Sequence, residues 1–440
     1  MLAVAVAGSD PAFAATGTLE GERFSLSPVA GQAYGDAGAS GGRALLIWNN
    51  ATASTSVTAS VPARLTVRAR GDQCAGAPAM AVRVDGVRVL SASVSSSAFT
   101  TYQTGGDVAP GAHTVSVSYT NDYRSKWCDR NLRLDAVTLT AATQSSTVRN
   151  PLASAKLHVD PWSAARKQAD AWRPTRPADA AQLDKIATQP QAEWFGEWSG
   201  EIEAAVSSRV GAAAAAGAVP VLVAYGIPER DCGSYSAGGL SSADAYRTWV
   251  RGFAKGIGDR AAVVILEPDA LALLSCLSAT DRATRLALLE DAVGVLEARP
   301  AVSVYLDAGH SAWVAADEMA DRLTNAGVAQ AQGFALNVSN FRLTPELLTY
   351  GKDLSARIGG KHFVLDTSRN GLGPSEGGQW CNPPGRALGP TPRTLSTADS
   401  KVDAYLWIKR PGESDGPCDG GPSAGTFWAD YALGLAQRTP

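Results

Sequence analysis

Residues 261–274, which read AAVVILEPDALALL, decide the fold of the longer part of this chain. The continuous apolar run 261–266 has the length and β-branching of a strand that is buried on both faces. Pro268 ends that strand, because proline has no N–H to donate to a neighbouring strand. The turn leaves Asp269 at the carboxyl end of the strand, where an α/β protein usually places its chemistry. Asp269 is equally suited to cap a following helix, so the segment by itself leaves both interpretations open.

From residue 152 onward, apolar strands alternate with helical segments. Strands are predicted at residues 193–195, 219–224, 261–266, 301–306, 333–338, 362–365 and 405–408. Helical segments are predicted at 202–216, 243–256, 282–298, 314–326 and 426–436. The alternation predicts an α/β fold with about seven parallel strands, which suits a distorted (β/α) barrel better than a doubly wound sheet. No glycine-rich nucleotide motif follows a strand, so no nucleotide cofactor is expected.

Residues 16–142 contain short alternating apolar runs separated by Gly, Pro, Asp and Asn, without a long helical pattern. This spacing predicts an N-terminal antiparallel β-sandwich domain, with Asp85-Gly86 in a tight hairpin turn. A short polar linker is expected at residues 143–152, followed by a second domain over residues 153–440.

Composition and charge restrict the function. The 440 residues are 45% hydrophobic and 18% charged, with a formal net charge of −3, which favours neither nucleic acid nor a membrane surface as a partner. Residues 1–15 combine an apolar run with the small-x-small sequence Ala12-Phe13-Ala14, which predicts a signal-peptide remnant and hence a secreted, extracellular protein. No other run approaches the length of a membrane span, and we expect a monomer.

Six cysteines suit an exported protein with three disulfides. Fifteen pairings are formally possible. The cysteines fall in local pairs along the chain, which favours Cys74 with Cys128, Cys232 with Cys276, and Cys381 with Cys418. A zinc site is the alternative, but no C-x-x-C spacing occurs and the four histidines lie far from the cysteines.

Polar side chains follow nearly every predicted strand of the second domain. They are Tyr225, Arg230, Asp231, Asp269, Asp307, His310, Asn340, Asp366, Arg369, Lys409, Glu413 and Asp415. In a parallel barrel these strand ends meet at one rim, so the side chains are expected to converge in a single cleft. Carboxylates packed together cannot all ionise at neutral pH. One of them is therefore expected to stay protonated, as glycoside hydrolysis requires of its acid.

Aromatic residues accompany these carboxylates. They are Trp194, Tyr225, Trp313 and Trp380. Flat aromatic faces beside carboxylates, with little positive charge, suit neutral sugar rings that stack and form hydrogen bonds. Packing inside a hydrophobic core is the alternative for each of them.

Seven motifs of the second domain form an ordered set. They are YGIPERDCG, VILEPDAL, YLDAGHSAW, NVSNF, DTSRNG, QWCNPPGRALG and LWIKRPGESDG. Together they resemble glycoside hydrolase family 6, the inverting cellulases, over about residues 153–440. The resemblance implies a cellulase that needs no cofactor for catalysis. It also implies two disulfides, which match Cys232–Cys276 and Cys381–Cys418.

The resemblance also implies roles for individual residues. Asp269 falls on the general acid, Asp231 on the neighbour that raises its pKa, and Asp415 on the candidate base. Tyr225 and Arg230 complete the catalytic set. Substrate contacts are implied for Trp194, Asp307, His310, Trp313, Asn340, Trp380, Lys409 and Glu413.

The turns after the strands and the interval between Cys381 and Cys418 are short, which predicts an open cleft. An open cleft favours cutting within chains, so we expect an endo-β-1,4-glucanase that hydrolyses cellulose with inversion of anomeric configuration. A cellobiohydrolase, a mixed-linkage β-glucanase and an inactive carbohydrate-binding protein are the alternatives.

The first domain carries RGDQCAGAP, TNDY and CDRNLRLD. From the residues alone, their Asn and Asp side chains are most simply explained as turn formers. The motifs nevertheless resemble calcium-dependent carbohydrate-binding modules of the xylan-binding type, over roughly residues 17–140. The resemblance implies a Ca²⁺ ion that bridges protein and sugar, with Asp122 and Asp129 as its ligands. Xylan and cellulose are competing ligands for this domain.

Overall fold

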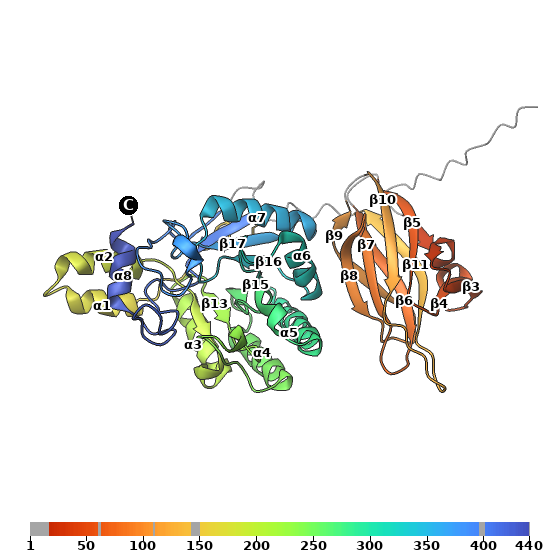
Figure 1. Ribbon diagram of the computed structural model, residues 1–440, viewed down its shortest axis with the longest axis horizontal. Coiled ribbons are helices and arrows are strands. Elements are labelled where there is room, and N and C mark those ends of the chain that lie inside the picture. The colour runs from red at the N-terminus through yellow and green to blue at the C-terminus, as the bar shows by residue number, and fades with distance from the viewer. Residues whose placement is uncertain (1–16, 60–62, 109–110, 142–149, 396–400, 440) are drawn as a thin grey trace, which may run out of the picture. The chain divides into compact units, whose positions relative to one another are not determined.

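The computed structural model describes residues 17–59, 63–108, 111–141, 150–395 and 401–439 (Figure 1). The chain divides into two compact units, Met1–Thr147 and Val148–Pro440, and each is described by itself. The predicted signal remnant and most of the predicted linker lie outside the described residues. None of the helices in the described part has the length and apolarity needed to cross a bilayer.

The first unit consists of two antiparallel sheets. One has the strand order β3-β4-β11-β6-β9 with β1 also paired to β11, and the other has the order β2-β5-β10-β7-β8. Leu65, Val67 and Ala69 alternate along β6 and are buried, because one face of each sheet meets the core. Asp85 and Gly86 connect β7 to β8 with φ of 51° and 82°, the left-handed conformation of a tight hairpin turn. The strands are β1 Gly17–Glu20, β2 Ser25–Ser27, β3 Gly31–Gly35, β4 Arg43–Ile47, β5 Ala51–Ala59, β6 Ala63–Asp72, β7 Ala79–Val84, β8 Val87–Ser93, β9 Thr100–Val108, β10 Gly111–Tyr119 and β11 Asn131–Ala141.

The second unit is an α/β domain around one eight-stranded sheet, in the order β12-β13-β14-β15-β16-β17-β19-β18. The pairings from β12 to β19 are parallel and β18 joins antiparallel. Within the described residues no strand pairing joins β12 to β19 or β18, so the sheet is open on this side. One backbone hydrogen bond, from Ala192 N to Trp407 O (3.0 Å), spans the opening. The strands are β12 Glu193–Phe195, β13 Val221–Ala224, β14 Ala262–Leu266, β15 Val302–Asp307, β16 Gly333–Leu336, β17 His362–Asp366, β18 Arg393–Thr394 and β19 Val402–Leu406.

Some helices cover the sheet, and others form a separate group around the C-terminal helix α8. They are α1 Ala164–Trp172, α2 Pro177–Ala187, α3 Ile202–Ala215, α4 Ala243–Ile257, α5 Ala279–Glu297, α6 Ala316–Asn325, α7 Thr344–Arg357 and α8 Ala429–Gln437. Three of them, α1, α2 and α7, were not among the helices predicted. Figure 1 shows α1, α2 and α8 side by side, and their apolar residues form a core of their own.

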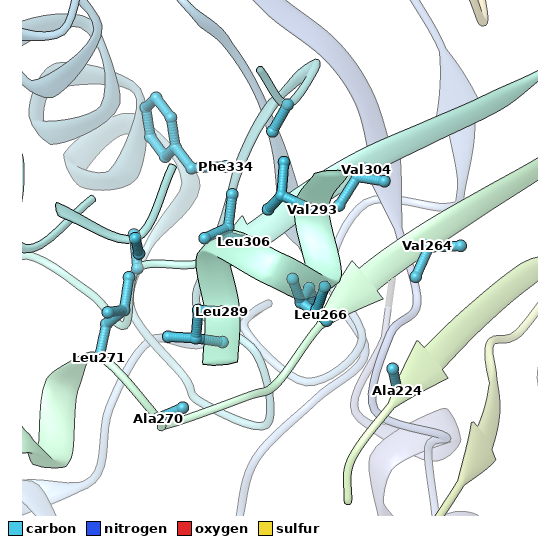
Figure 2. Packing of buried hydrophobic residues seen from close by; sticks show 14 of the residues in the cluster. Ala224, Val264, Leu266, Ala270, Leu271, Leu289, Val293, Val304, Leu306 and Phe334 are labelled. Carbon is cyan, nitrogen blue, oxygen red and sulfur yellow. The ribbon is translucent and has the colours of Figure 1, made fainter. Parts of the chain in front are cut away.

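Strand β14 is buried on both faces, as its uninterrupted apolar run predicted. Val264 and Leu266 point toward α5, where Leu289 and Val293 meet them (Figure 2). The alternate residues Val263 and Ile265 belong to the core on the opposite face of the sheet. Because neither face meets water, the strand carries no polar residue until it reaches the turn at its end.

Candidate active site

Two disulfides fix the loops that carry the predicted site residues. Cys232–Cys276 links the residue after Asp231 to the short helix Ala272–Cys276, which follows the Asp269 turn. Cys381–Cys418 links the residue after Trp380 to the loop of Asp415. The third disulfide, Cys74–Cys128, lies in the first unit. All six cysteines are therefore occupied in disulfides, in the pairs that their order along the chain favoured, and none is available to zinc.

The turn of residues 267–269, called the acid turn below, and the loop of Asp231 contain backbone in the left-handed region. Glu267, Asp269 and Asp231 have φ of 49°, 69° and 57°, which costs non-glycine residues energy and is characteristic of functional sites. Asp269 does not cap a helix with its side chain. The short helix that follows begins after Leu271, with no side-chain cap.

Asp269 is surrounded by other carboxylates. Its backbone N donates to Asp307 Oδ2 at 2.9 Å. Burial raises the pKa of Asp269 well above its ordinary value, and the negative charges of Asp307, Asp231 and Asp415 raise it further. Lys409 opposes them by lowering it. Burial and the neighbouring carboxylates therefore both favour the protonated form of Asp269.

Asp307 and Asp231 are held by different contacts. Asp307 Oδ2 also accepts from Gly309 N at 3.2 Å, while its buried Oδ1 has no hydrogen-bond partner among the described residues. Burial raises the pKa of Asp307 to about 7. Asp231 accepts from Ser236 N at 2.8 Å, and burial raises its pKa to a smaller extent than that of Asp269.

Asp415 lies in the opposite electrostatic environment. Arg369 Nη1 donates to Asp415 Oδ2 at 2.7 Å, and Lys409 Nζ lies 3.3 Å from Oδ1. Asn382 N also donates to Oδ2 at 3.0 Å. Burial alone would raise the pKa of Asp415, but Arg369 and Lys409 outweigh it and the pKa is lowered. Asp415 is thus ionised at pH values where Asp269 is protonated.

The Arg230 side chain forms hydrogen bonds and an ion pair with residues around Tyr225. Its guanidinium forms a bidentate pair with Glu197 at 2.7 and 3.0 Å, and Nη1 donates to Tyr225 O at 2.7 Å. The Arg230 guanidinium carbon also lies 4.4 Å from the centre of the Tyr225 ring. Burial and the charges of Asp269 and Asp231 raise the pKa of Tyr225 well above its ordinary value. The phenol therefore stays neutral at the edge of the carboxylate cluster.

The predicted sugar platforms differ in exposure. Trp313 is 37% and Trp380 46% exposed, so both offer a face to a ligand. Trp194 is only partly exposed, because it packs edge-on against Tyr225 at 5.1 Å and donates from Nε1 to Ile408 O at 2.8 Å.

The remaining predicted substrate contacts fall in two places. His310 lies 5.5 Å from Trp313 between ring centres. Burial lowers the pKa of His310 to about 4, with a contribution from Arg342 and an opposing hydrogen bond from Asn340. A neutral imidazole can accept or donate a hydrogen bond but does not supply a proton. Glu413, by contrast, pairs with Arg410 at 3.0 Å and is not among the groups that shift the pKa of Asp269.

Several residues of the site were not predicted. Glu267 is buried and accepts from Gly226 N and Ile227 N at 3.0–3.1 Å, which ties the acid turn to the loop after Tyr225. Glu197, the partner of Arg230, was also missed. It stands directly after a predicted strand, so the rule that located the other carboxylates would have found it.

Asp366 was predicted only as one of the polar residues that follow strands, without a role of its own. Its two oxygens accept from the backbone N of Ser339, Ser368, Ile408 and Lys409 at 2.9–3.3 Å. This single carboxylate joins the ends of β16, β17 and β19 and fixes the backbone that presents Lys409.

The predicted calcium ligands of the first unit are both found near Tyr119. Both Asp122 and Asp129 act on the pKa of Tyr119, and Tyr119 OH donates to Asp122 Oδ1 at 3.3 Å. Asp129 Oδ1 is buried without a hydrogen-bond partner among the described residues. Two carboxylates with one unused oxygen suit Ca²⁺, which binds oxygen atoms. No group of three or more His, Cys, Asp or Glu side chains forms a metal site in the described residues, so the fit is partial.

Comparison with known proteins agrees with this geometry. Residues 152–439 match the family described as glycosyl hydrolases family 6. The chain is 45% identical over 291 residues to endoglucanase A of Cellulomonas fimi, and 47% identical over 290 residues to endoglucanase A of Thermobispora bispora. The matches cover 66% and 64% of this chain, and 62% of the length of each relative.

A solved structure extends the comparison. It is the endoglucanase Cel6 of Mycobacterium tuberculosis in complex with methyl-cellobiosyl-4-deoxy-4-thio-β-D-cellobioside. The identity is 49% and the TM-score 0.63, over 66% of this chain and 99% of that one. The chain belongs to glycosyl hydrolases family 6. Residues 64–151 in addition match a Ca-dependent xylan-binding carbohydrate-binding module.

Proposed function

We propose that this protein is a secreted endo-β-1,4-glucanase that cleaves cellulose with inversion at the anomeric carbon. The observation that carries the proposal is the opposite surroundings of two buried carboxyl groups. Asp269 lies beside the carboxylate of Asp307, whereas Asp415 is paired with Arg369 and Lys409, so the pKa of Asp269 is raised and that of Asp415 is lowered. An inverting glycosidase needs one protonated and one ionised carboxyl group at the same pH. The endoglucanase relatives at 45% and 47% identity support the same activity.

The reaction divides between the two carboxyl groups. Asp269 donates its proton to the glycosidic oxygen as the bond between that oxygen and the anomeric carbon breaks. A water molecule attacks the same carbon from the opposite face, and its proton passes to Asp415, directly or through a second water. Tyr225 and Arg230 shape the subsite of the reacting sugar, and the charge of Asp231 contributes to the raised pKa of Asp269.

Substrate contacts are proposed for the aromatic and polar residues predicted from the strand ends. We propose Trp194, Trp313 and Trp380 as stacking platforms. Asp307, His310, Asn340, Lys409 and Glu413 are the proposed hydrogen-bonding contacts to the sugar hydroxyls.

We further infer that the sheet is a distorted barrel of seven parallel strands that opens between β12 and β19. The hydrogen bonds from Ala192 N to Trp407 O and from Arg410 Nε to Ala192 O (2.7 Å) support this arrangement. For the first unit we propose Ca²⁺-dependent glycan binding through Asp122 and Asp129, with xylan or cellulose as ligand.

The activity is tested by comparing viscosity loss with reducing ends released from a soluble cellulose derivative. An endoglucanase thins the polymer with few ends released, whereas a cellobiohydrolase releases ends with little thinning. Asp269→Asn should lower kcat by about 10²–10⁴-fold, the usual contribution of proton donation. The control is Asp259→Asn, whose side chain is 98% exposed. Full activity in Asp269→Asn would contradict the proposal.

A further inference from the structure

One hollow region of the second unit has no role in the candidate active site. A groove of about 780 Å³ lies between α3, β12 and residues 158–162. A second hollow of about 280 Å³ adjoins it and shares part of its lining. The shared residues are His158, Asp160, Trp162, Lys167, Glu193 and Arg209. We call the two hollows together the α3 groove.

Two exposed tryptophans line this groove. Trp162 is 74% exposed and Trp198 is 55% exposed. Leaving an indole in water forgoes the free energy that burial of its apolar surface would provide. Two such rings along one groove provide flat faces on which sugar rings can stack.

Paired charges form the floor of the groove. Arg209 joins Asp160 at 3.0 Å and Glu193 at 2.7 Å, and Arg410 joins Glu193 at 2.7 Å and Glu413 at 3.0 Å. With Lys167, the lining carries three positive and three negative groups, which cancel. A neutral ligand with many hydroxyl groups suits such a floor better than an anion does.

His158 adds an unused hydrogen-bonding group. It is 8% exposed, its backbone N donates to Val219 O at 2.9 Å, and it lines both hollows. No hydrogen bond to its ring is found in the described residues. Burial, and the charge of Arg209, lower the pKa of His158, so the ring is neutral and presents one donor and one acceptor.

The groove adjoins Tyr225 of the candidate active site. Trp194 and Trp198 line it, and both rings also pack against Tyr225, at 5.1 and 6.5 Å between ring centres. Glu413 lines the smaller hollow. Trp194 and Trp198 therefore connect the candidate active site to the groove.

We propose that the α3 groove binds a β-1,4-glucan chain as it extends beyond the candidate cleft, with Trp162 and Trp198 as stacking platforms and His158 with the paired charges as hydrogen-bonding partners. The inference rests on the proposed function and deepens it. A chain held both in the cleft and in the groove continues past Trp194, so the bond that is cut lies inside the polymer.

The test uses Asp269→Asn protein, which should cleave oligosaccharides about 10²–10⁴-fold more slowly, and measures Kd for cellobiose and cellohexaose by calorimetry. Trp162→Ala is the decisive change, since Trp198 also lies over Arg230 at 5.1 Å. We expect Trp162→Ala to weaken cellohexaose binding about fivefold, the effect of one lost stacking contact, and to leave cellobiose unchanged. Trp162→Phe should restore most of the affinity.

The matched control is Trp172→Ala, which removes a partly buried tryptophan of α1 that lines neither hollow and should change neither Kd. An unchanged cellohexaose Kd in Trp162→Ala would overturn the inference, and so would equal losses for both sugars. Hydrolysis of soluble cellulose by the wild type is measured alongside. If the wild type hydrolyses cellulose but Trp162→Ala binds cellohexaose as tightly as the parent protein, only the inference about the α3 groove is refuted. If the wild type does not hydrolyse cellulose, the proposed function is refuted.

Discussion

At the scale of the residue, Asp269 and Asp415 show how one functional group acquires two roles. Asp269 is buried among carboxylates, so its proton is retained, whereas Asp415 is buried between Arg369 and Lys409, so its charge is retained. Burial acts in the same direction on both groups. The sign of the neighbouring charges is what separates them.

Asp231→Asn is expected to move the basic limb of the pH profile of kcat/KM to lower pH. Asp269 must be protonated to act, so activity falls as the pH rises through its pKa. Burial is the largest cause of that raised pKa, and the Asp231 charge adds to it. Removing the charge therefore lowers the pKa of Asp269.

Asp259→Asn serves as the control for this measurement, because its fully exposed charge is screened by solvent. A basic limb that stays in place, or moves to higher pH, in Asp231→Asn would contradict the assignment of Asp269 as the acid.

The candidate site residues could be predicted to the extent that they follow strands. Asp269 and Asp307 both lie at the end of a buried apolar run, so the pattern located them. The pairings of Arg230 with Glu197 and of Arg369 with Asp415 could not be predicted. These partners are joined through space, and no spacing along the chain reports such contacts.

At the scale of the element, the contact between β14 and α5 supports the acid turn. Leu289 of α5 is 1% exposed and packs in the same core as Leu266, which immediately precedes the turn. The strand that presents Asp269 is therefore positioned by apolar contacts on both of its faces.

Leu289→Ala is expected to lower the free energy of unfolding by about 2–5 kcal/mol, the cost of a cavity in a packed core. Urea denaturation of the full chain, followed by tryptophan fluorescence, measures this change. Leu286→Ala, at a partly buried position of the same helix, should cost clearly less. Equal losses in the two variants would mean that α5 does not pack as described.

The elements that pack on the sheet were predicted more completely than those that do not. β12 matches its predicted bounds, and α3 differs from them by one residue. Helices α1 and α2, which pack on α8 and on each other, lie outside the strand–helix alternation and were missed. Helix α7 was also missed, although it lies between β16 and β17 and packs on β17. β19 was predicted at 405–408 but spans Val402–Leu406, since its apolar run continues past the last strand pairing.

At the scale of the whole molecule, each unit has its own sheet architecture and its own core. Apolar residues at every second position predicted the β-sandwich of the first unit. The succession of apolar strands and helices predicted the α/β fold of the second unit. Closure of the barrel could not be predicted, because it depends on whether the first and last parallel strands meet, and no local pattern encodes that contact.

Removing Ca²⁺ is expected to weaken glycan binding by the first unit without affecting catalysis by the second. In affinity gels containing xylan or cellulose, a chelator should abolish retardation of the full chain, and added Ca²⁺ should restore it. Asp129→Asn should behave like the chelated wild type, because it removes the charge of the carboxylate whose Oδ1 has no hydrogen-bond partner. Hydrolysis of a soluble cello-oligosaccharide is the internal control and should stay constant.

Retardation that persists in the chelator, with either polysaccharide, would contradict a role for calcium in this unit. Retardation by one gel only would identify the ligand of the first unit.

The central claim, an inverting hydrolysis with Asp269 as its acid, is tested most directly by proton NMR of the products formed from a soluble cello-oligosaccharide. The new reducing end should appear first as the α-anomer, since inversion of a β-linkage gives α. Asp269→Asn should release the product about 10²–10⁴-fold more slowly. Initial release of the β-anomer would mean a retaining mechanism and would contradict the roles proposed for Asp269 and Asp415.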